Sequence, residues 1–337
     1  MNYIIVGGSG FIGTHLAGLL REGNPTASIY NIDILDPRFV DSGEVRPPVL
    51  KSGQKRDSVY VEADVRKPLE SLPFTPTPDD VIFNLAAVHR SPGHREEEYF
   101  ETNVNGAINV CRFAEASGIT NIVFVSSIDV YGPSEEVKDE TSTPMPTMPY
   151  GRSKVEAEKI NLDWQKGDPG KRRLTIVRPG VVFGKGENGN FTRLYKSLHR
   201  HRFAYPGRKD TVKSCIYVKD LARFLVWAAH ESKPGTEIYN CCYPEPVTVE
   251  RIVGAMKKTT HLSGKVPNLP NAVIMPLAYM AKAVGSPLGI CPQRVRKLQI
   301  SKNINSSKMV ATGFELKYPL EEAIVDWYTD NDNLSLE

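Results

Sequence analysis

A glycine-rich segment directly after the first apolar run constrains the fold of this chain more than any other feature. Residues Tyr3–Val6 have the pattern of a buried strand, and Phe11–Arg21 have that of an amphipathic helix. Gly8, Gly10 and Gly13 fit the spacing G-x-G-x-x-G, and with Gly7 the segment also fits G-x-x-G-x-x-G. Glycine suits such a turn because a Cβ would block the bend and keep the backbone away from a pyrophosphate, which the free N–H groups of the helix bind. The segment therefore predicts a dinucleotide site.

Apolar and amphipathic segments alternate along the first half of the chain. The runs that predict strands are Tyr3–Val6, Ser28–Asp33, Val59–Glu62, Val81–Leu85, Ile122–Ser126 and Leu174–Arg178. The patterns that predict helices are Phe11–Arg21, Glu97–Ser117 and Tyr150–Gln165. Strands separated by helices favour an α/β fold with a doubly wound, mostly parallel sheet of the Rossmann type.

The pattern changes after Arg178. Helices are predicted at Asn190–Arg200, Asp220–His230, Val249–Thr259 and Leu320–Thr329, and short strands at Ser214–Val218 and Glu237–Asn240. We therefore expect a dinucleotide-binding domain over residues 1–180 and a smaller α/β substrate lobe over residues 181–337, with a soft boundary between them.

Composition excludes several classes of function. The 337 residues carry 42 Lys or Arg against 39 Asp or Glu, a net charge of +3 that argues against a nucleic-acid-binding protein. Five cysteines without a C-x-x-C pair and histidines without H-E-x-x-H predict no metal site and a reducing, cytoplasmic location. The start of the chain reads as a strand and not as a signal peptide. The most apolar stretch, residues 272–281, is interrupted by Pro276 and falls short of the ~20 residues of a membrane span.

Acidic and small residues at later strand ends extend the dinucleotide prediction. Asp33 ends the second strand 20 residues after Gly13, where a carboxylate binds a ribose 2′-hydroxyl and repels a 2′-phosphate. This favours NAD over NADP, although Arg38 leaves NADP open. Asp64 follows the third strand and either binds the adenine amino group or caps a helix. Small residues in Asn84-Leu85-Ala86-Ala87 would let the cofactor lie close to the fourth strand.

Tyr150 and Lys154 are the predicted acid–base pair. Their i, i+4 spacing places them on one helix face, and an ammonium beside a phenol lowers a phenol pKa that is ordinarily about 10. A second Y-x-x-x-K, Tyr205 to Lys209, contains Pro-Gly and cannot be helical. Ser127, at the carboxyl end of the fifth strand, either donates a hydrogen bond to a reacting oxygen or only forms a turn.

These motifs together carry a family resemblance. In chain order they are Gly7–Gly13, Asp33, Asn84–Ala87, Thr102–Gly106, Ser126-Ser127, Val130–Gly132, Tyr150-x-x-x-Lys154 and Arg178-Pro179. The chain resembles the extended short-chain dehydrogenase/reductase family, in its NAD-dependent epimerase/dehydratase group, which mostly modifies nucleotide-diphosphate sugars. The resemblance implies a catalytic triad of Ser127, Tyr150 and Lys154, and a homodimer packed through the helices near 97–117 and 150–165. The residues assigned to NAD are Gly7, Gly10, Phe11, Ile12, Gly13, Asp33, Asp64, Val65, Leu85, Ala86, Ala87, Asn103, Ser126, Tyr150 and Lys154.

Two positions separate this chain from branches of the family. The 4,6-dehydratases carry Asp-Glu after the catalytic Ser/Thr, and this chain has Ile128-Asp129. Dehydration is therefore disfavoured, and Asp129 is either a second acid–base group or, as we favour, a carboxylate that orders its loop. Val181 replaces the usual Asn after Arg-Pro, and Lys213 replaces an Arg, so a substrate without a nucleotide stays open.

A basic stretch lies where the family binds the substrate diphosphate. Residues 193–213 contain seven Lys or Arg and one acid, Asp210, which favours an anionic substrate over a merely solvated surface. Arg294 and Arg296 are weaker candidates for a second phosphate contact. The residues assigned to the substrate are Ser127, Asn190, Arg208 and Lys213.

The sequence thus predicts an NAD-dependent nucleotide-diphosphate-sugar epimerase acting at C4 through a transient keto-sugar, in polysaccharide biosynthesis. A 4-keto-sugar reductase that uses NAD(P)H is the nearest alternative. A hydroxysteroid-type dehydrogenase is another, in which the apolar residues 266–290 face lipid instead of packing the second lobe as we expect. A cofactor-sensing scaffold is disfavoured because Tyr150 and Lys154 are both present.

Overall fold

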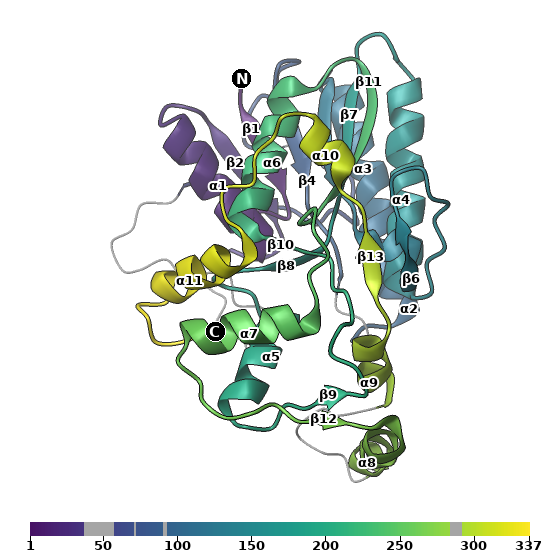
Figure 1. Cartoon of the computed structure of the whole chain (residues 1–337). Coiled ribbons are helices and arrows are strands. Elements are labelled where there is room, and N and C mark those ends of the chain that lie inside the picture. Colours follow the sequence, from purple (N-terminus) through teal and green to yellow (C-terminus); the bar gives the residue numbers. More distant parts are fainter. Residues whose placement is uncertain (37–56, 71, 90–92, 284–291) are drawn as a thin grey trace.

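A seven-stranded parallel sheet forms the centre of the molecule (Figure 1). The computed structural model describes residues 1–36, 57–70, 72–89, 93–283 and 292–337. The strands lie in the order β11-β7-β5-β4-β1-β2-β3, and each neighbouring pair is parallel. Their bounds are β1 Tyr3–Val6, β2 Ile29–Asp33, β3 Val59–Glu62, β4 Val81–Asn84, β5 Asn121–Val125, β7 Arg173–Pro179 and β11 Gly235–Cys241. The predicted doubly wound parallel sheet is confirmed.

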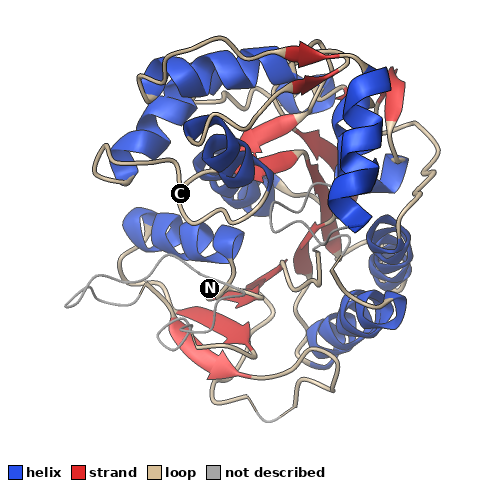
Figure 2. Cartoon of the chain, turned by 90° about the horizontal axis from the view of Figure 1, so that it is seen from below, coloured by secondary structure: helices blue, strands red, loops and turns tan. Residues whose placement is uncertain are grey.

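Helices cover both faces of this sheet (Figure 2). Helices α1 (Phe11–Gly23) and α6 (Val218–Glu231) pack on one face, and α3 (Asn105–Ala116) and α4 (Pro149–Lys166) pack on the other. Alternate side chains of β1 point to opposite faces of the sheet. Ile5 packs in the cluster that includes α1 and α6, and Ile4 packs in the cluster that includes α3 and α4. Burial on both faces explains why the strands read as continuous apolar runs in the sequence.

The two halves of the chain share the central sheet. Strand β11 pairs with β7 from Gly235 beside Arg173 to Cys241 beside Pro179, and α6 packs beside α1. Strand β11 and helix α6 both follow residue 180 in the chain. A domain boundary at residue 180 would therefore separate β11 from β7, its partner in the sheet. The two-domain division stays a prediction.

The second lobe is built around a separate apolar cluster that includes Phe183, Tyr217, Met256 and Trp327. Its elements are β8 (Val181–Phe183), α5 (Asn190–His199), β9 (Tyr205–Pro206), β10 (Cys215–Tyr217), α7 (Val249–Thr259), β12 (Asn268–Leu269), α8 (Asn271–Ala283), α9 (Pro292–Gln299) and α11 (Leu320–Asp330). Helix α10 (Ser307–Ala311) packs instead against β11 of the central sheet. A parallel pair of β6 (Ser134–Lys138) and β13 (Lys302–Ile304) ties this lobe to the segment after β5. Among the described residues, the helices are all too short or too polar to cross a bilayer.

Two predicted elements differ in the structure. The helix predicted over Glu97–Ser117 consists of α2 (Glu96–Tyr99), a π-helical segment Phe100–Val104, and α3. The expectation that residues 266–290 pack the second lobe is wrong for one face of α8, because Val273 and Met280 are 46% and 58% exposed. Residues 284–290 lie outside the described part of the chain.

Candidate active site and cofactor site

The glycine loop between β1 and α1 is shaped by close backbone contacts. Gly7 has φ +82°, and a Cβ there would lie 2.7 Å from the Ala86 Cα. A Cβ on Gly13 would lie 2.5 Å from the Gly8 Cα, so this glycine lets α1 pack against the loop. At Gly10 the nearest atom is the Gly7 carbonyl oxygen at 3.4 Å, which leaves room for a ligand in front of the helix.

The N-terminus of α1 suits an anionic group. Gly10 is the N-cap and has no side chain to accept from the first N–H groups, and the first turn contains no acidic residue. These N–H groups and the positive end of the helix dipole can therefore bind a pyrophosphate. The loop thus fits NAD, with Gly7, Gly10 and Gly13 providing the space. The predicted residues Phe11 and Ile12 also pack against the apolar cluster of the second lobe.

Asp33 lies at the end of β2 and holds the glycine loop. Its Oδ2 accepts a hydrogen bond from the Ser9 backbone N–H at 3.0 Å, and its Oδ1 accepts one from Leu35 at 3.1 Å. Burial raises the pKa of the Asp33 carboxyl, and these backbone donors oppose the rise. The carboxylate is therefore placed beside the loop that would hold the pyrophosphate, and its role with the ribose stays a prediction. Arg38 lies outside the described residues.

Several other residues predicted for NAD bind parts of the protein itself. Asp64 accepts hydrogen bonds from the Arg66 guanidinium, at 2.9 Å from Nε to Oδ2, and from the Arg66 backbone N–H, which lowers its pKa. In the described part of the chain no helix directly follows Asp64, so the expected helix cap is wrong as stated, and the carboxylate caps the turn at residues 64–67 instead. Val65 is buried, and its carbonyl accepts from the side chain of Asn109.

Asn103 fixes the backbone after β4. Its Oδ1 accepts from the Val88 N–H at 2.8 Å, and its Nδ2 donates to the Ser153 hydroxyl at 2.8 Å. Leu85 donates from its backbone to the Val6 carbonyl, and Leu85, Ala86 and Ala87 are half-buried next to the glycine loop. Asn103 thus joins the strand end that faces the loop to helix α4.

The predicted catalytic residues lie together at the carboxyl end of β5 and the start of α4. Ser127 begins the 3-10 turn Ile128–Tyr131, and its Oγ accepts from the Asp129 N–H at 3.1 Å. Pro149 occupies the first turn of α4, which places Tyr150 at the helix start and Lys154 one turn later. The Ser127 side chain lies near Tyr150 as a hydrogen-bond partner that lowers the tyrosine pKa. Ser127, Tyr150 and Lys154 therefore form one cluster, and their catalytic roles stay predictions.

Burial governs the protonation of this cluster. The Lys154 side chain is 1% exposed, and its Nζ lies 4.3 Å from the centre of the Phe124 ring. Burial lowers the pKa of Lys154 to about 7, against the attraction of Glu158. Burial also raises the pKa of Tyr150 to about 12, against the hydrogen bond of Ser127. The expectation that Lys154 lowers the pKa of Tyr150 stays a prediction.

Replacing Lys154 with methionine is expected to stabilise the fold at neutral pH. The lysine pKa is about 7 in the folded chain against an ordinary value of 10.5, so the unfolded chain binds more protons between these two pH values. The contribution of the Lys154 amine to the free energy of unfolding therefore rises between about pH 7 and pH 10.5, and it is least favourable at or below pH 7. We expect Lys154→Met to raise the free energy of unfolding by about 1–3 kcal/mol near pH 7, with the gain shrinking toward pH 10.

Urea titrations at several pH values measure this difference. Lys159→Met on the same helix is the control, because that lysine is 60% exposed and its loss should change stability by less than about 0.5 kcal/mol. A Lys154→Met chain that is less stable than the wild type near neutral pH contradicts the burial argument.

A buried polar network beneath the cluster was not predicted. Glu158 accepts hydrogen bonds from the Ser126 hydroxyl at 2.5 Å and from the Arg178 guanidinium at 2.9 Å (Nε) and 2.6 Å (Nη2). Arg178 also donates to the Tyr131 hydroxyl at 2.6 Å, which donates to Asn240 Oδ1 at 2.8 Å. Ser126, predicted to bind NAD, thus uses its side chain within this network.

One sequence signal could have located Glu158. Tyr150, Lys154 and Glu158 are spaced i, i+4 and i+8, which places all three on one face of α4. The partners Arg178 and Asn240 come from β7 and β11, and no local pattern links them to α4.

The residues predicted for the substrate diphosphate already have partners. Arg208 pairs with Asp210 (2.8 Å, Nε to Oδ1) and with Glu135 (2.9 Å, Nη1 to Oε1). The Lys213 ammonium donates to the Ile300 carbonyl at 2.8 Å, and Asn190, at the start of α5, accepts from Arg193. A bound diphosphate would have to compete with these contacts, so the four substrate assignments stay predictions.

The second proposed phosphate contact is only partly described. Arg296 is exposed on α9, and its Nη2 lies 3.5 Å from the Tyr279 hydroxyl. The Arg294 side chain lies outside the described part of the structure.

Position 128, where the dehydratases carry an acid, is apolar and buried here. Ile128 is 2% exposed and packs with Val130 and Ile304. Its neighbour Asp129 forms an ion pair with Lys302 of β13. The pair joins the 3-10 turn to the second lobe, which favours the loop-ordering reading of Asp129.

Replacing Gly13 with alanine is expected to destabilise the loop and weaken cofactor binding. The new Cβ would meet the Gly8 Cα at 2.5 Å, and two backbone segments would have to move apart. We expect a loss of about 1–3 kcal/mol in unfolding free energy and a fall of at least about tenfold in NAD affinity, measured by urea titration and calorimetry. Gly23→Ala in the same helix is the control, because nothing lies within 4 Å of its Cβ position, and it should be neutral or slightly stabilising. Equal behaviour of the two variants would contradict the packing argument.

A dinucleotide cradle and a Ser–Tyr–Lys group, both at the carboxyl edge of one parallel sheet, fit an enzyme that transfers hydride with a bound nicotinamide cofactor. Comparison with known proteins identifies the family. The sequence model of the NAD dependent epimerase/dehydratase family matches residues 3–242, and the chain belongs to this family. The chain is therefore an enzyme of the extended short-chain dehydrogenase/reductase type, and its cofactor is NAD.

Two curated relatives are 4-epimerases. The chain is 28% identical to the N-acetyl-alpha-D-glucosaminyl-diphospho-ditrans,octacis-undecaprenol 4-epimerase of Escherichia coli O157:H7, over 96% of this chain and 93% of that protein. It is 30% identical to the UDP-glucose 4-epimerase of Yersinia pestis, over 77% of this chain and 82% of that protein.

Solved structures share the fold. The UDP-glucuronic acid 4-epimerase of Bacillus cereus, in complex with NAD, superposes with a TM-score of 0.73 at 18% identity and covers 99% of both chains. The UDP-glucose 4-epimerase of Thermus thermophilus, in complex with NAD, superposes with a TM-score of 0.71 at 18% identity, over 99% of this chain and 100% of that one.

Proposed function

We propose that the chain is an NAD-dependent 4-epimerase of a sugar that is linked to its carrier through a diphosphate. The similarity to a 4-epimerase over 96% of the chain carries this proposal. The cluster of Ser127, Tyr150 and Lys154 beside the glycine loop supplies the groups that the reaction needs.

The proposal assigns each side chain of the cluster one role. Tyr150 takes the proton of the sugar 4-hydroxyl and returns it, and Ser127 donates a hydrogen bond to the same oxygen. NAD⁺ held by the loop of Gly7, Gly10 and Gly13 would supply the acceptor for the hydride of C4 and would return that hydride to the opposite face of the keto-sugar. Lys154 lies one turn beyond Tyr150, where its protonated form would favour the phenolate and its amine would help to hold the ribose of the cofactor. A net redox reaction does not occur, because each turnover returns the hydride.

The dehydratase reaction of some family members is disfavoured. One relative, at 27% identity over 70% of this chain, is the dTDP-D-glucose 4,6-dehydratase of Mus musculus. Elimination of water needs an acid that protonates the leaving hydroxyl. Buried Ile128 cannot supply it, and Asp129 is paired with Lys302.

Two carriers fit the proposal. A nucleotide is the carrier in the Yersinia pestis relative, and a polyprenol is the carrier in the Escherichia coli relative. The match to the second extends over nearly the whole chain, including the lobe that would bind the substrate. Val181 and Lys213 also depart from the residues that usually bind a nucleotide diphosphate in this family. We therefore favour a lipid-linked sugar diphosphate and keep a nucleotide sugar as the second candidate.

Direct assay of both candidates tests the function. The purified chain is incubated with N-acetylglucosaminyl-diphospho-undecaprenol in detergent or with UDP-N-acetylglucosamine in buffer, without added cofactor. The released sugar is then identified by chromatography and NMR. We expect the galacto epimer at equilibrium with the starting sugar and no net formation of NADH. Absence of the epimer from both substrates, in a chain that retains NAD, would contradict the proposal.

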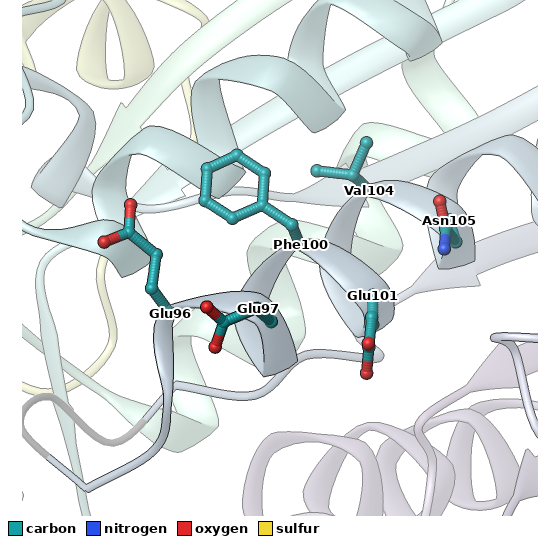
Figure 3. A pocket seen from close by; sticks show the side chains of 6 residues that line it. All are labelled: Glu96, Glu97, Phe100, Glu101, Val104 and Asn105. Atoms are coloured by element: carbon teal, nitrogen blue, oxygen red, sulfur yellow. The ribbon is translucent and has the colours of Figure 1, made fainter.

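We also propose a homodimer through α3 and α4. An open hollow of about 380 Å³ lies on this face, lined by Glu96, Glu97, Phe100, Glu101, Val104 and Asn105 (Figure 3). The ion pair between Arg152 and Glu96, at 2.6 Å, fixes the α4 edge of this face against α2. Sedimentation velocity tests the assembly, and a monomer at micromolar concentration would contradict it.

We also propose that the chain is located in the cytoplasm. Cys111, Cys215, Cys241 and Cys242 are buried and are not in disulfides. Burial raises the pKa of the Cys111 and Cys242 thiols to about 12, so they stay protonated and unreactive. Buried unpaired thiols are usual in proteins of a reducing compartment. Cys291 lies outside the described residues.

A further inference from the structure

Helix α8 has apolar side chains on two faces and is packed on one. Ala278 is fully buried, and α8 contacts α9. Val273, Leu277 and Met280, spaced i, i+4 and i+7, share another face and are 46%, 46% and 58% exposed. Figure 1 shows α8 at the far end of the second lobe, beyond β9 and β12. A helix that is apolar all round is ordinarily buried, so the outer face of α8 needs a partner.

The charge of this region indicates the chemistry of the partner. Residues 262–283 and 292–299 contain five Lys or Arg and no Asp or Glu, although acids and bases are nearly balanced over the whole chain. The side chains of Lys265 and Arg296 are exposed. Two copies of such a surface would repel each other, whereas anionic lipid headgroups attract it. An exposed apolar helix face in a segment that is rich in Lys and Arg is typical of helices that lie in a membrane interface.

The same region is joined to the stretch predicted to bind the substrate diphosphate. Strand β9 pairs with β12, and the Gly207 N–H donates to the Leu269 carbonyl at 2.8 Å, immediately before α8. Arg208 follows in the chain, and the Lys213 ammonium binds the Ile300 carbonyl just after α9. Helices α8 and α9 are therefore directly connected to the stretch that contains the two basic residues predicted for the substrate diphosphate.

We propose that the outer face of α8, formed by Val273, Leu277 and Met280, docks on an anionic membrane surface. The contact is peripheral, since α8 has 13 residues and a span needs ~20. Docking presents the active site to a sugar diphosphate whose lipid tail stays in the bilayer. The access to a lipid-linked substrate rests on the proposed function. The binding of α8 to a membrane surface does not depend on that function.

Vesicle flotation tests the docking surface. The full-length wild-type chain is mixed with vesicles of phosphatidylcholine alone, or of phosphatidylcholine with phosphatidylglycerol. The double variant Leu277→Glu/Met280→Glu removes the apolar face and adds repulsion. We expect the wild type to float with the anionic vesicles and the double variant to bind them at least about tenfold more weakly. Val325→Glu is the matched control, because Val325 is a 50% exposed valine on α11, and it should bind like the wild type.

The outcomes separate docking from catalysis. A wild type that stays unbound, or a double variant that floats equally well, overturns the docking proposal. Loss of binding in the Val325→Glu control would show a general charge effect and would also overturn it. The NAD content and the epimerisation of UDP-N-acetylglucosamine are measured on the same preparations. A chain that floats but epimerises neither substrate overturns the proposed function and leaves the docking surface intact.

Discussion

Replacing Tyr150 with phenylalanine is expected to reduce epimerase turnover by about 10²–10⁴-fold, the usual contribution of a positioned general acid–base group. The variant removes only the hydroxyl that moves the sugar proton. The ring stays packed near Tyr99, whose centroid lies 6.4 Å away, so the start of α4 should keep its geometry. NAD binding should therefore be unchanged, because the glycine loop and Asp33 are untouched.

The matched control uses the second Y-x-x-x-K of the chain. Tyr205 lies in β9, and Lys209 is paired with Glu250 instead of the tyrosine. Tyr205→Phe should keep turnover near that of the wild type. Turnover, KM and the bound NAD of both variants are measured together. Loss of NAD from Tyr150→Phe, or an equal loss of turnover in Tyr205→Phe, would refute the assignment of proton transfer to Tyr150.

Replacing Glu158 with glutamine is expected to cost about 3–5 kcal/mol of unfolding free energy, the usual effect of breaking a buried ion pair. Glu158 and Arg178 are each 5% exposed at the side chain, and the variant leaves the guanidinium buried without its countercharge. The Ser126 hydroxyl would also lose its carboxylate acceptor. Urea denaturation monitored by circular dichroism measures the change.

The control lies on the same helix. Glu156 pairs with Lys159 at 2.7 Å, and these side chains are 46% and 60% exposed. Glu156→Gln should therefore change stability by less than about 1 kcal/mol. The double variant Glu158→Leu/Arg178→Met removes both charges and should recover much of the loss. Equal stabilities of Glu158→Gln and Glu156→Gln would contradict the buried network.

Local sequence patterns predicted those features that are determined within a single segment of the chain, such as one strand, one loop or one helix. Strand β1 is a fully buried apolar run, whereas β3 lies at the edge of the sheet with only Val61 buried, and the predicted ends of both strands agree with the structure. The glycine loop was predictable because the turn and the packing of α1 both require small residues at fixed spacing. The proximity of Tyr150 and Lys154 likewise follows from the period of one helix.

Long-range pairings could not be read from such patterns. Strand β11 joins β7 across about sixty residues, and its own sequence does not specify this neighbour. Arg208 looked available to a diphosphate because Glu135, which neutralises it, lies 73 residues earlier in the chain. The exposure of one face of α8 could not be predicted either. An apolar pattern predicts that a helix is buried, but it does not show whether another segment covers each face.

The cofactor carried by the freshly purified chain tests the central claim most directly. An epimerase returns the hydride in every turnover, so its NAD⁺ need not leave between reactions. We therefore predict stoichiometric NAD⁺ that survives dialysis and is released by heat, identified by absorbance and mass spectrometry. A chain that retains no dinucleotide and instead binds NADH or NADPH reversibly would contradict the account, because it would indicate net redox chemistry.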